Sequence, residues 1–130
     1  MDRLFLDANV LFSAACRPGA GLCQLWKLKN VALCSSRYAI EEARINLEHE
    51  DQRQRLAVLE SHLHLFESTE LPRGISLPEK DAPILRAALA AKATHLLTGD
   101  LRHFGPYFGK KVAGIAIVLP GEYLRSAAKK

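Results

Sequence analysis

Residues 4–14 read LFLDANVLFSA, and this stretch joins a short apolar run to an amphipathic segment through one acid, Asp7. The run at residues 4–6 is typical of a buried strand, whereas residues 10–16 place apolar side chains at helical spacing. A strand that leads directly into a helix is the first half of a β–α unit. Because parallel neighbours need long crossover connections, such units favour a parallel sheet.

The same alternation continues along the chain. Further strands are predicted at residues 32–34, 62–66, 95–98 and 114–119, and further helices at residues 22–29, at 36–49, from 51 onward and at 81–92. Ser36 is the expected N-cap of the helix over 36–49, and Ile40, Ala43 and Leu47 form its buried stripe. Residues 125–130 are expected to fray. The interleaved order predicts an α/β fold with helices on both faces of the sheet.

Composition is that of one globular domain, predicted to span residues 1–130. The 130 residues are 48% hydrophobic and 25% charged, which excludes the disordered and fibrous classes. The longest apolar run, residues 112–119, is far shorter than the ~20 residues of a membrane helix, so no membrane partner is expected. Three cysteines without a CxxC pair favour a reducing compartment, and we predict a cytoplasmic protein.

Four acids fall where an α/β fold concentrates its chemistry. Asp7 follows a predicted strand, Asp100 follows another, and Asp81 stands at a helix start. Ligands of such sheets bind outside the carboxyl ends of the strands, so acids there are candidate site residues. Each also has a purely structural interpretation, because Asp7 and Asp81 suit helix N-termini and Asp100 suits a turn.

The fourth candidate lies inside the helix predicted over residues 36–49. Glu41 and Glu42 are adjacent there, and Glu41 has Arg37 and Arg44 at the spacing of helical ion pairs. At about 100° per residue, Glu42 lies nearer the buried stripe than Glu41 does. We therefore expect Glu42 to be the partly buried member of the pair.

Together these segments resemble the PIN domain family. LFLDANVLFSA resembles its opening motif, SRYAIEEARINL its second, in which a Ser precedes the acid by six positions, and DAPILRAALAAKATHLLTGD its third and fourth. LRHF at residues 101–104 and IVLPGEYL at 117–124 also fit, so the resemblance covers nearly the whole chain. Ala8 departs from it, because the family commonly has Thr there.

The resemblance implies a three-layer α/β/α fold around a mostly parallel sheet, and a nuclease. It assigns the catalytic and metal-binding roles to Asp7, Glu42, Asp81 and Asp100, with Asn9 and Thr98 in support. It further implies an RNA substrate, a homodimer and, as in many VapC-like members, a toxin whose partner is an antitoxin protein.

Chemistry supports a metal at such a site. Two unit charges ~4 Å apart repel by about 4 kcal/mol at an effective dielectric near 20, so clustered carboxylates need a counter-charge. Oxygen ligands without a Cys or His cluster favour Mg²⁺ or Mn²⁺ over Zn²⁺. The resulting hypothesis is phosphodiester hydrolysis by an activated water, with Glu42 either ligating a second ion or orienting that water.

The remaining charge suits a polyanion. Of the 14 acidic residues, ten remain once these four are set aside, against 18 Lys and Arg, and the net charge of the chain is +4. Candidates for a phosphate track are Arg37, Arg44, Arg102, Lys110 and Lys111.

Three alternatives stay open at this point. A metal-activated water needs no 2′-hydroxyl, so a DNA-directed nuclease remains. A non-catalytic PIN-like module that binds nucleic acid or protein is the second. A phosphoaspartate protein is the third, and it fits poorly because Asn9 stands where a phosphatase of that kind has an acid.

Overall fold

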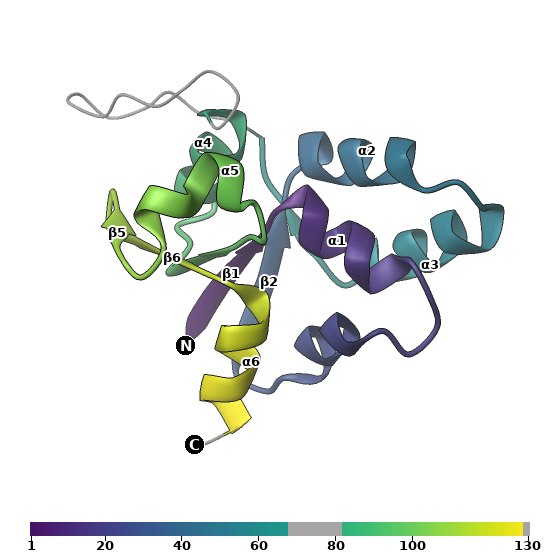
Figure 1. The fold of residues 1–130 in the computed structure, drawn as a ribbon, viewed down its shortest axis with the longest axis horizontal. Helices are drawn as coiled ribbons and strands as arrows, with labels where there is room; N and C mark the ends of the chain where they lie inside the picture. Colours follow the sequence, from purple (N-terminus) through teal and green to yellow (C-terminus); the bar gives the residue numbers. More distant parts are fainter. Residues whose placement is uncertain (68–81, 129–130) are drawn as a thin grey trace.

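The computed structural model describes residues 1–67 and 82–128, in which helices surround a central sheet (Figure 1). The described strands are β1 (Asp2–Leu6), β2 (Val31–Ser35), β3 (His64–Leu65), β4 (His95–Leu97), β5 (Lys111–Val112) and β6 (Ile115–Val118). Their order in the sheet is β3-β2-β1-β4-β6-β5. All neighbours pair in parallel except β5, which is antiparallel to β6. The predicted α/β class with a mostly parallel sheet is confirmed.

Helices fill the connections between strands. They are α1 (Ala8–Ala15), α2 (Arg37–Asn46), α3 (Glu50–Glu60), α4 (Ala82–Ala90), α5 (Leu101–Phe104) and α6 (Pro120–Ala128), with 3-10 helices η1 (Gly21–Lys27) and η2 (Gly105–Tyr107). Helix α1 packs against α2 and α3, and α6 packs against η1 (Figure 1). Across the described residues, no helix combines the length and apolar character needed to cross a membrane.

The centre of the core is strand β1. Leu4, Phe5 and Leu6 are all fully buried, as are Leu96 and Leu97 of the neighbouring β4. Successive strand residues point to opposite faces, so an uninterrupted buried run requires that both faces of the sheet be covered. This is the three-layer arrangement that the sequence predicts.

The register of the central strands brings their carboxyl ends to one level. Leu6 pairs with Leu97 across β1 and β4, and the amide of Asp7 donates to the Leu97 carbonyl at 3.1 Å. On the other side of β1, the Ser35 hydroxyl at the end of β2 donates to the Leu6 carbonyl at 2.8 Å. The residues that follow β1, β2 and β4 therefore emerge together at one edge.

Helix α2 forms where it is predicted, but it ends at Asn46, three residues before the predicted end at residue 49. The Ser36 hydroxyl caps it by accepting from the Ala39 amide at 3.1 Å, and Ile40, Ala43 and Leu47 are buried. A side-chain oxygen at this position satisfies one of the amides that a helix start leaves without a partner. The cap and the apolar stripe together fix which face of α2 points away from the core.

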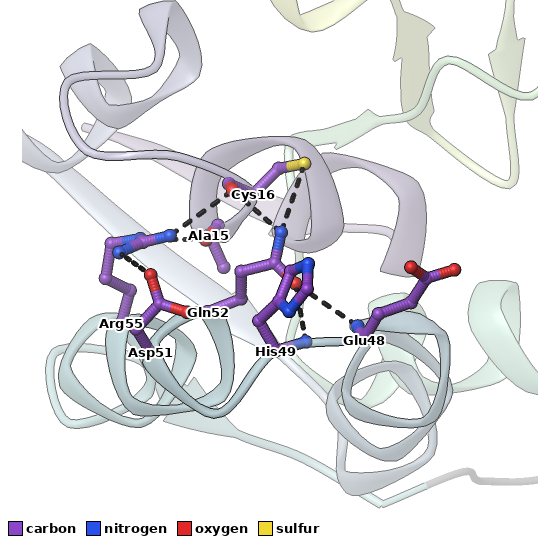
Figure 2. A network of polar contacts seen from close by, with 7 residues as sticks. All are labelled: Ala15, Cys16, Glu48, His49, Asp51, Gln52 and Arg55. Carbon is purple, nitrogen blue, oxygen red and sulfur yellow. Dashed lines mark hydrogen bonds and ion pairs between the residues drawn. The ribbon is translucent and has the colours of Figure 1, made fainter.

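The carboxyl end of α1 is held by side chains of α3 (Figure 2). Gln52 Nε2 donates to the Cys16 carbonyl at 2.9 Å, and Arg55 donates to the carbonyls of Ala15 at 3.0 Å and Cys16 at 3.3 Å. Gln52 Oε1 in turn accepts from the His49 amide at 3.0 Å. These bonds satisfy carbonyls that the end of a helix leaves open, and they tie α3 to the helix that begins at Asp7.

Replacing Arg55 by Met is expected to lower the free energy of unfolding by about 1–2 kcal/mol, because partly buried carbonyls at the end of α1 lose their donors. Urea unfolding measures the change. Arg125→Met is the control, since its pair with Glu122 at 3.8 Å is exposed and such pairs contribute little. Equal effects of the two substitutions would contradict the capping role of Arg55.

Three sequence expectations need correction, and one strand has no counterpart among them. The helix predicted at 22–29 is the 3-10 helix η1, and the strand predicted at 62–66 is reduced to β3 because α3 and its closing turn extend to residue 63. Strand β5 was not predicted. The tail expected to fray from residue 125 is helical to Ala128, because Tyr123 and Leu124 pack α6 onto the core. Residues 129 and 130 lie outside the described range.

Candidate active site

Asp7 lies at the junction of β1 and α1 and is only 5% exposed. Its Oδ1 accepts from the Ala8 amide at 2.7 Å, so it is the N-cap of α1, as the structural interpretation predicts. Its Oδ2 accepts from the Thr98 hydroxyl at 2.8 Å and from Asn9 Nδ2 at 3.3 Å. The carboxylate of Asp7 therefore both caps α1 and belongs to the candidate site, and hydrogen bonds to both its oxygens hold it in one orientation.

Asn9 and Thr98 join the ends of β1 and β4. Asn9 Nδ2 donates to Thr98 Oγ1 at 3.2 Å, and Asn9 Oδ1 accepts from the Gly99 amide at 2.7 Å. A Cβ on Gly99 would lie 3.3 Å from Asn9 Oδ1, so a side chain there would crowd this bond. Thr98 Oγ1 also accepts from the Asp100 amide at 3.1 Å. The loop that carries Asp100 is thereby attached to the residue that holds Asp7.

Glu42 reaches the same region from α2. Its side chain is exposed rather than partly buried, so the expectation of partial burial is wrong: the stripe of α2 faces the core and Glu42 stands at its margin. Glu41 points elsewhere and forms an ion pair with Arg44 of the same helix. The hydrogen bond from Arg44 holds the pKa of the Glu41 carboxyl below its usual range. The two glutamates therefore differ in their surroundings and not in their burial: Glu42 lines the cleft, and Glu41 pairs with Arg44.

A cleft of about 420 Å³ brings three of the four predicted acids together. Its described lining contains no basic residue and consists of Asp7, Ala8, Asn9, Phe12, Tyr38, Glu42, Ala43, Asn46, Ile84, Asp100 and Phe104. Thr98 lies behind it, fully buried. Asp81, the fourth predicted acid, lies outside the described residues. The cleft stands at the carboxyl ends of β1 and β4, where ligands of parallel sheets bind.

Burial raises the pKa of the Asp7 carboxyl above its ordinary value of 3.8. The hydrogen bonds from Thr98 and Ala8 act in the opposite direction, and the charges of Glu42 and Asp100 raise the pKa further. The charges of both other described acids of the cleft therefore act on the Asp7 carboxylate. A carboxylate whose ionised form is disfavoured in this way gains most from a nearby cation.

The donor set fits a hard divalent cation. Carboxylate oxygens of Asp7, Glu42 and Asp100 and amide oxygens of Asn9 and Asn46 line the cleft, with neither thiol nor imidazole in the described lining. Within residues 1–67 and 82–128, no three Asp, Glu, His or Cys side chains are grouped closely enough to hold a metal ion by themselves. Ligation by the described residues would thus need water or small side-chain movements.

Replacing Thr98 by Val removes the hydroxyl but keeps the shape of the side chain. We expect the free energy of unfolding to fall by about 2 kcal/mol, because a buried carboxylate loses a donor and two other groups lose their acceptor. Thr98→Ser keeps the hydroxyl and should lose less than about 1 kcal/mol, the value of one buried methyl group. Urea unfolding distinguishes them, and equal losses would contradict the role of the hydroxyl.

The lining also contains residues that the sequence analysis did not select. Phe12, Ile84 and Phe104 form its apolar part, while Tyr38 and Asn46 flank Glu42 on α2. Tyr38, Glu42 and Asn46 follow one another at a spacing of four, which places them along one side of a helix. That spacing is visible in the sequence and is the signal that would have identified them.

The fold belongs to the parallel α/β class, and it carries carboxylates at the carboxyl ends of its central strands, where proteins of this class bind their ligands. The sequence profile of the PIN domain matches residues 3–102, and the chain belongs to that family. PIN domains are generally nucleases that use divalent metal ions. The resemblance noted in the sequence is thereby confirmed.

A solved structure shares the fold. The chain resembles one from the crystal structure of VapBC2 from Rickettsia felis bound to a DNA fragment from their promoter, with a TM-score of 0.60. The two are 15% identical, and the match covers 88% of this chain and 96% of the other. A comparison with curated protein sequences finds no match.

Proposed function

We propose that the chain is a divalent-metal-dependent endoribonuclease that uses Mg²⁺ or Mn²⁺. The observation that carries the proposal is the cleft that Asp7, Glu42 and Asp100 line together, without a basic residue in its described lining. Like charges gathered in this way destabilise a protein unless a ligand compensates them.

Each acid has a distinct role in the proposal. Asp7 is the fixed ligand, because Thr98, Asn9 and the Ala8 amide hold both its oxygens in place. Asp100 is the second ligand, on a loop held by Thr98. Glu42 is exposed and free to adjust, which suits a residue that orients the attacking water or ligates a second ion. Asp81 remains the proposed fourth acid.

When bound, the divalent ion would supply the charge that activates water and stabilises the leaving oxygen. The side chains of the cleft would orient the ligating carboxylate and keep bulk water away from it. Asn9 and Thr98 keep the Asp7 carboxylate from rotating, and buried Phe104 forms part of the apolar lining of the cleft. Positioning residues of this kind commonly change activity 10- to 100-fold when they are removed.

RNA is the proposed substrate, and three exposed basic side chains suit its phosphates: Arg102, Lys110 and Lys111. Of the other candidates for the phosphate track, Arg44 is paired with Glu41 and Arg37 with Glu67 at 3.5 Å. These pairs are exposed, so phosphates compete for the arginines at little cost. The track we propose therefore begins with these three side chains, which form no ion pair with any residue that the structure describes.

We also propose a biological setting for the nuclease. The fold shared with a chain of a VapBC2 complex supports a toxin that pairs with an antitoxin protein, and the chain would act in the cytoplasm as a homodimer. Residues 1–130 would form a single PIN domain. An antitoxin would inhibit such a nuclease if it covered the cleft lined by the acids, because the substrate could then not reach them.

Incubation of the purified protein with labelled RNA and DNA tests the proposal. Cleavage of RNA in Mg²⁺ or Mn²⁺, and its loss in excess chelator, are the expected results. Cleavage of both nucleic acids would favour the DNA-directed alternative instead. Binding of RNA without cleavage under any metal would favour a non-catalytic module, and cleavage that persists in chelator would contradict the metal-dependent mechanism.

A further inference from the structure

Tyr38 stands beside the acids with its ring half in solvent. Its exposed fraction is 51%, and it lines the same cleft as Asp7 and Glu42. It lies in the first turn of α2, four residues before Glu42, so the two side chains are neighbours on one side of the helix. The other aromatic residues of the described lining, Phe12 and Phe104, belong to the core or pack against it.

The fold gives Tyr38 no structural task. The other two tyrosines each have one: Tyr107 packs against the core, and the Tyr123 hydroxyl donates to Asp2 while its ring meets His95 edge to face. Tyr38 belongs to neither the core nor its packed margin, and its hydroxyl forms no hydrogen bond within residues 1–67 and 82–128. A half-exposed aromatic residue that lines a polar cleft and stands outside the core is typical of a binding surface.

We propose that Tyr38 is a stacking platform for one base of single-stranded RNA, next to the phosphate that is cleaved. The inference rests on the proposed function and deepens it. Tyr38 lies about one helical turn, or ~5.4 Å along the axis, from Glu42, so its ring is within reach of a base next to a phosphate held at the acids. Aromatic rings stack on any base, so the contact favours unpaired RNA over duplex without selecting a sequence.

Binding measurements in an Asp7→Asn background isolate this contact from cleavage. The probe is a short fluorescent single-stranded RNA in Mg²⁺, alone or with one abasic nucleotide placed at each position in turn. Tyr38→Ala and Tyr38→Leu remove the ring, and Leu keeps an apolar side chain. Tyr38→Phe keeps the ring, and Ile45→Ala is the matched control, because Ile45 is an exposed apolar residue of the same helix that does not line the cleft.

Loss of the ring should weaken binding roughly tenfold or more, whereas Tyr38→Phe and Ile45→Ala should bind as the background does. One abasic position should weaken binding by a similar factor in the background and cause no further loss in Tyr38→Leu. The inference is overturned if Tyr38→Leu binds normally, if the abasic loss is unchanged without the ring, or if the background binds no RNA.

Failure of this contact and failure of the proposed function give different results. If the unmodified chain cleaves RNA in Mg²⁺ or Mn²⁺ but ring and base show no coupling, only the role of Tyr38 is wrong. If the unmodified chain cleaves no RNA while the coupling is present, stacking stands and the nuclease proposal falls.

Discussion

Replacing Asp7 by Asn should reduce RNA cleavage by roughly a hundredfold or more. The side chain keeps its size, so the reason is chemical: an amide cannot ligate a hard cation as a carboxylate does, and such ligation is worth several kcal/mol in the transition state. Asp7 is the best oriented of the described acids, with both oxygens engaged. Metal-dependent cleavage of labelled RNA measures the loss.

The same substitution should change how stability depends on pH. Because burial and neighbouring acids raise the pKa of Asp7, the folded chain binds this proton more tightly than the unfolded chain does. The free energy of unfolding therefore falls as pH rises from about 4 through the folded pKa. Asn does not titrate, so the Asp7→Asn variant lacks this decline.

Urea unfolding at pH 4 and pH 7 is the corresponding measurement. The difference in unfolding free energy between the unmodified chain and Asp7→Asn should shift in favour of the variant as pH rises. The comparison largely cancels the titration of the other ionisable groups, because both proteins contain them. A difference that shifts the other way would mean that the Asp7 carboxylate is stabilised by its surroundings, contrary to this account.

Replacing Glu42 by Gln should reduce cleavage roughly 10- to 100-fold with little change in stability. Glu42 is exposed, so its removal leaves no buried group without a partner, whereas its charge faces Asp7 across the cleft. A large effect on rate with a small effect on unfolding is characteristic of a residue used for chemistry.

Glu41→Gln is the matched control for this prediction. It makes the same chemical change one residue away, on a side chain that pairs with Arg44 and does not line the cleft. Exposed pairs of this kind contribute little to stability, so cleavage and unfolding should both stay near those of the unmodified chain. Similar losses of cleavage in the two variants would show that the charge of α2, and not Glu42 itself, matters.

Much of the fold was predictable because it depends on patterns that local sequence displays. The buried run at residues 4–6 marks the central strand, and Ser36 with Ile40, Ala43 and Leu47 marks α2 and its orientation. Asp7 and Asp100 were selected by one rule, that residues after parallel strands share an edge. The register of β1 against β4 is the physical reason that the rule succeeded.

Other features depend on contacts that a sequence does not display. Helix α6 forms because Tyr123 and Leu124 meet a core assembled from distant residues, and β5 pairs with β6 through only two residues. The exposure of Glu42 depends on how far α2 is rotated about its axis relative to the helices and strands that it packs against. The periodicity of apolar residues predicts that rotation only to within part of a turn. The spacing of four between Tyr38 and Glu42 is visible in the sequence, but the half-exposed position of Tyr38 in the lining of the cleft is visible only in the structure.

The central claim is that Asp7, Glu42 and Asp100 act as one divalent-cation site. Calorimetric titration of Mn²⁺ into the unmodified chain and into Asp7→Asn at pH 7 tests it without any substrate. We expect the unmodified chain to bind the ion and the variant to bind it at least tenfold more weakly. Equal affinity in both proteins, or no binding by the unmodified chain, would contradict the claim.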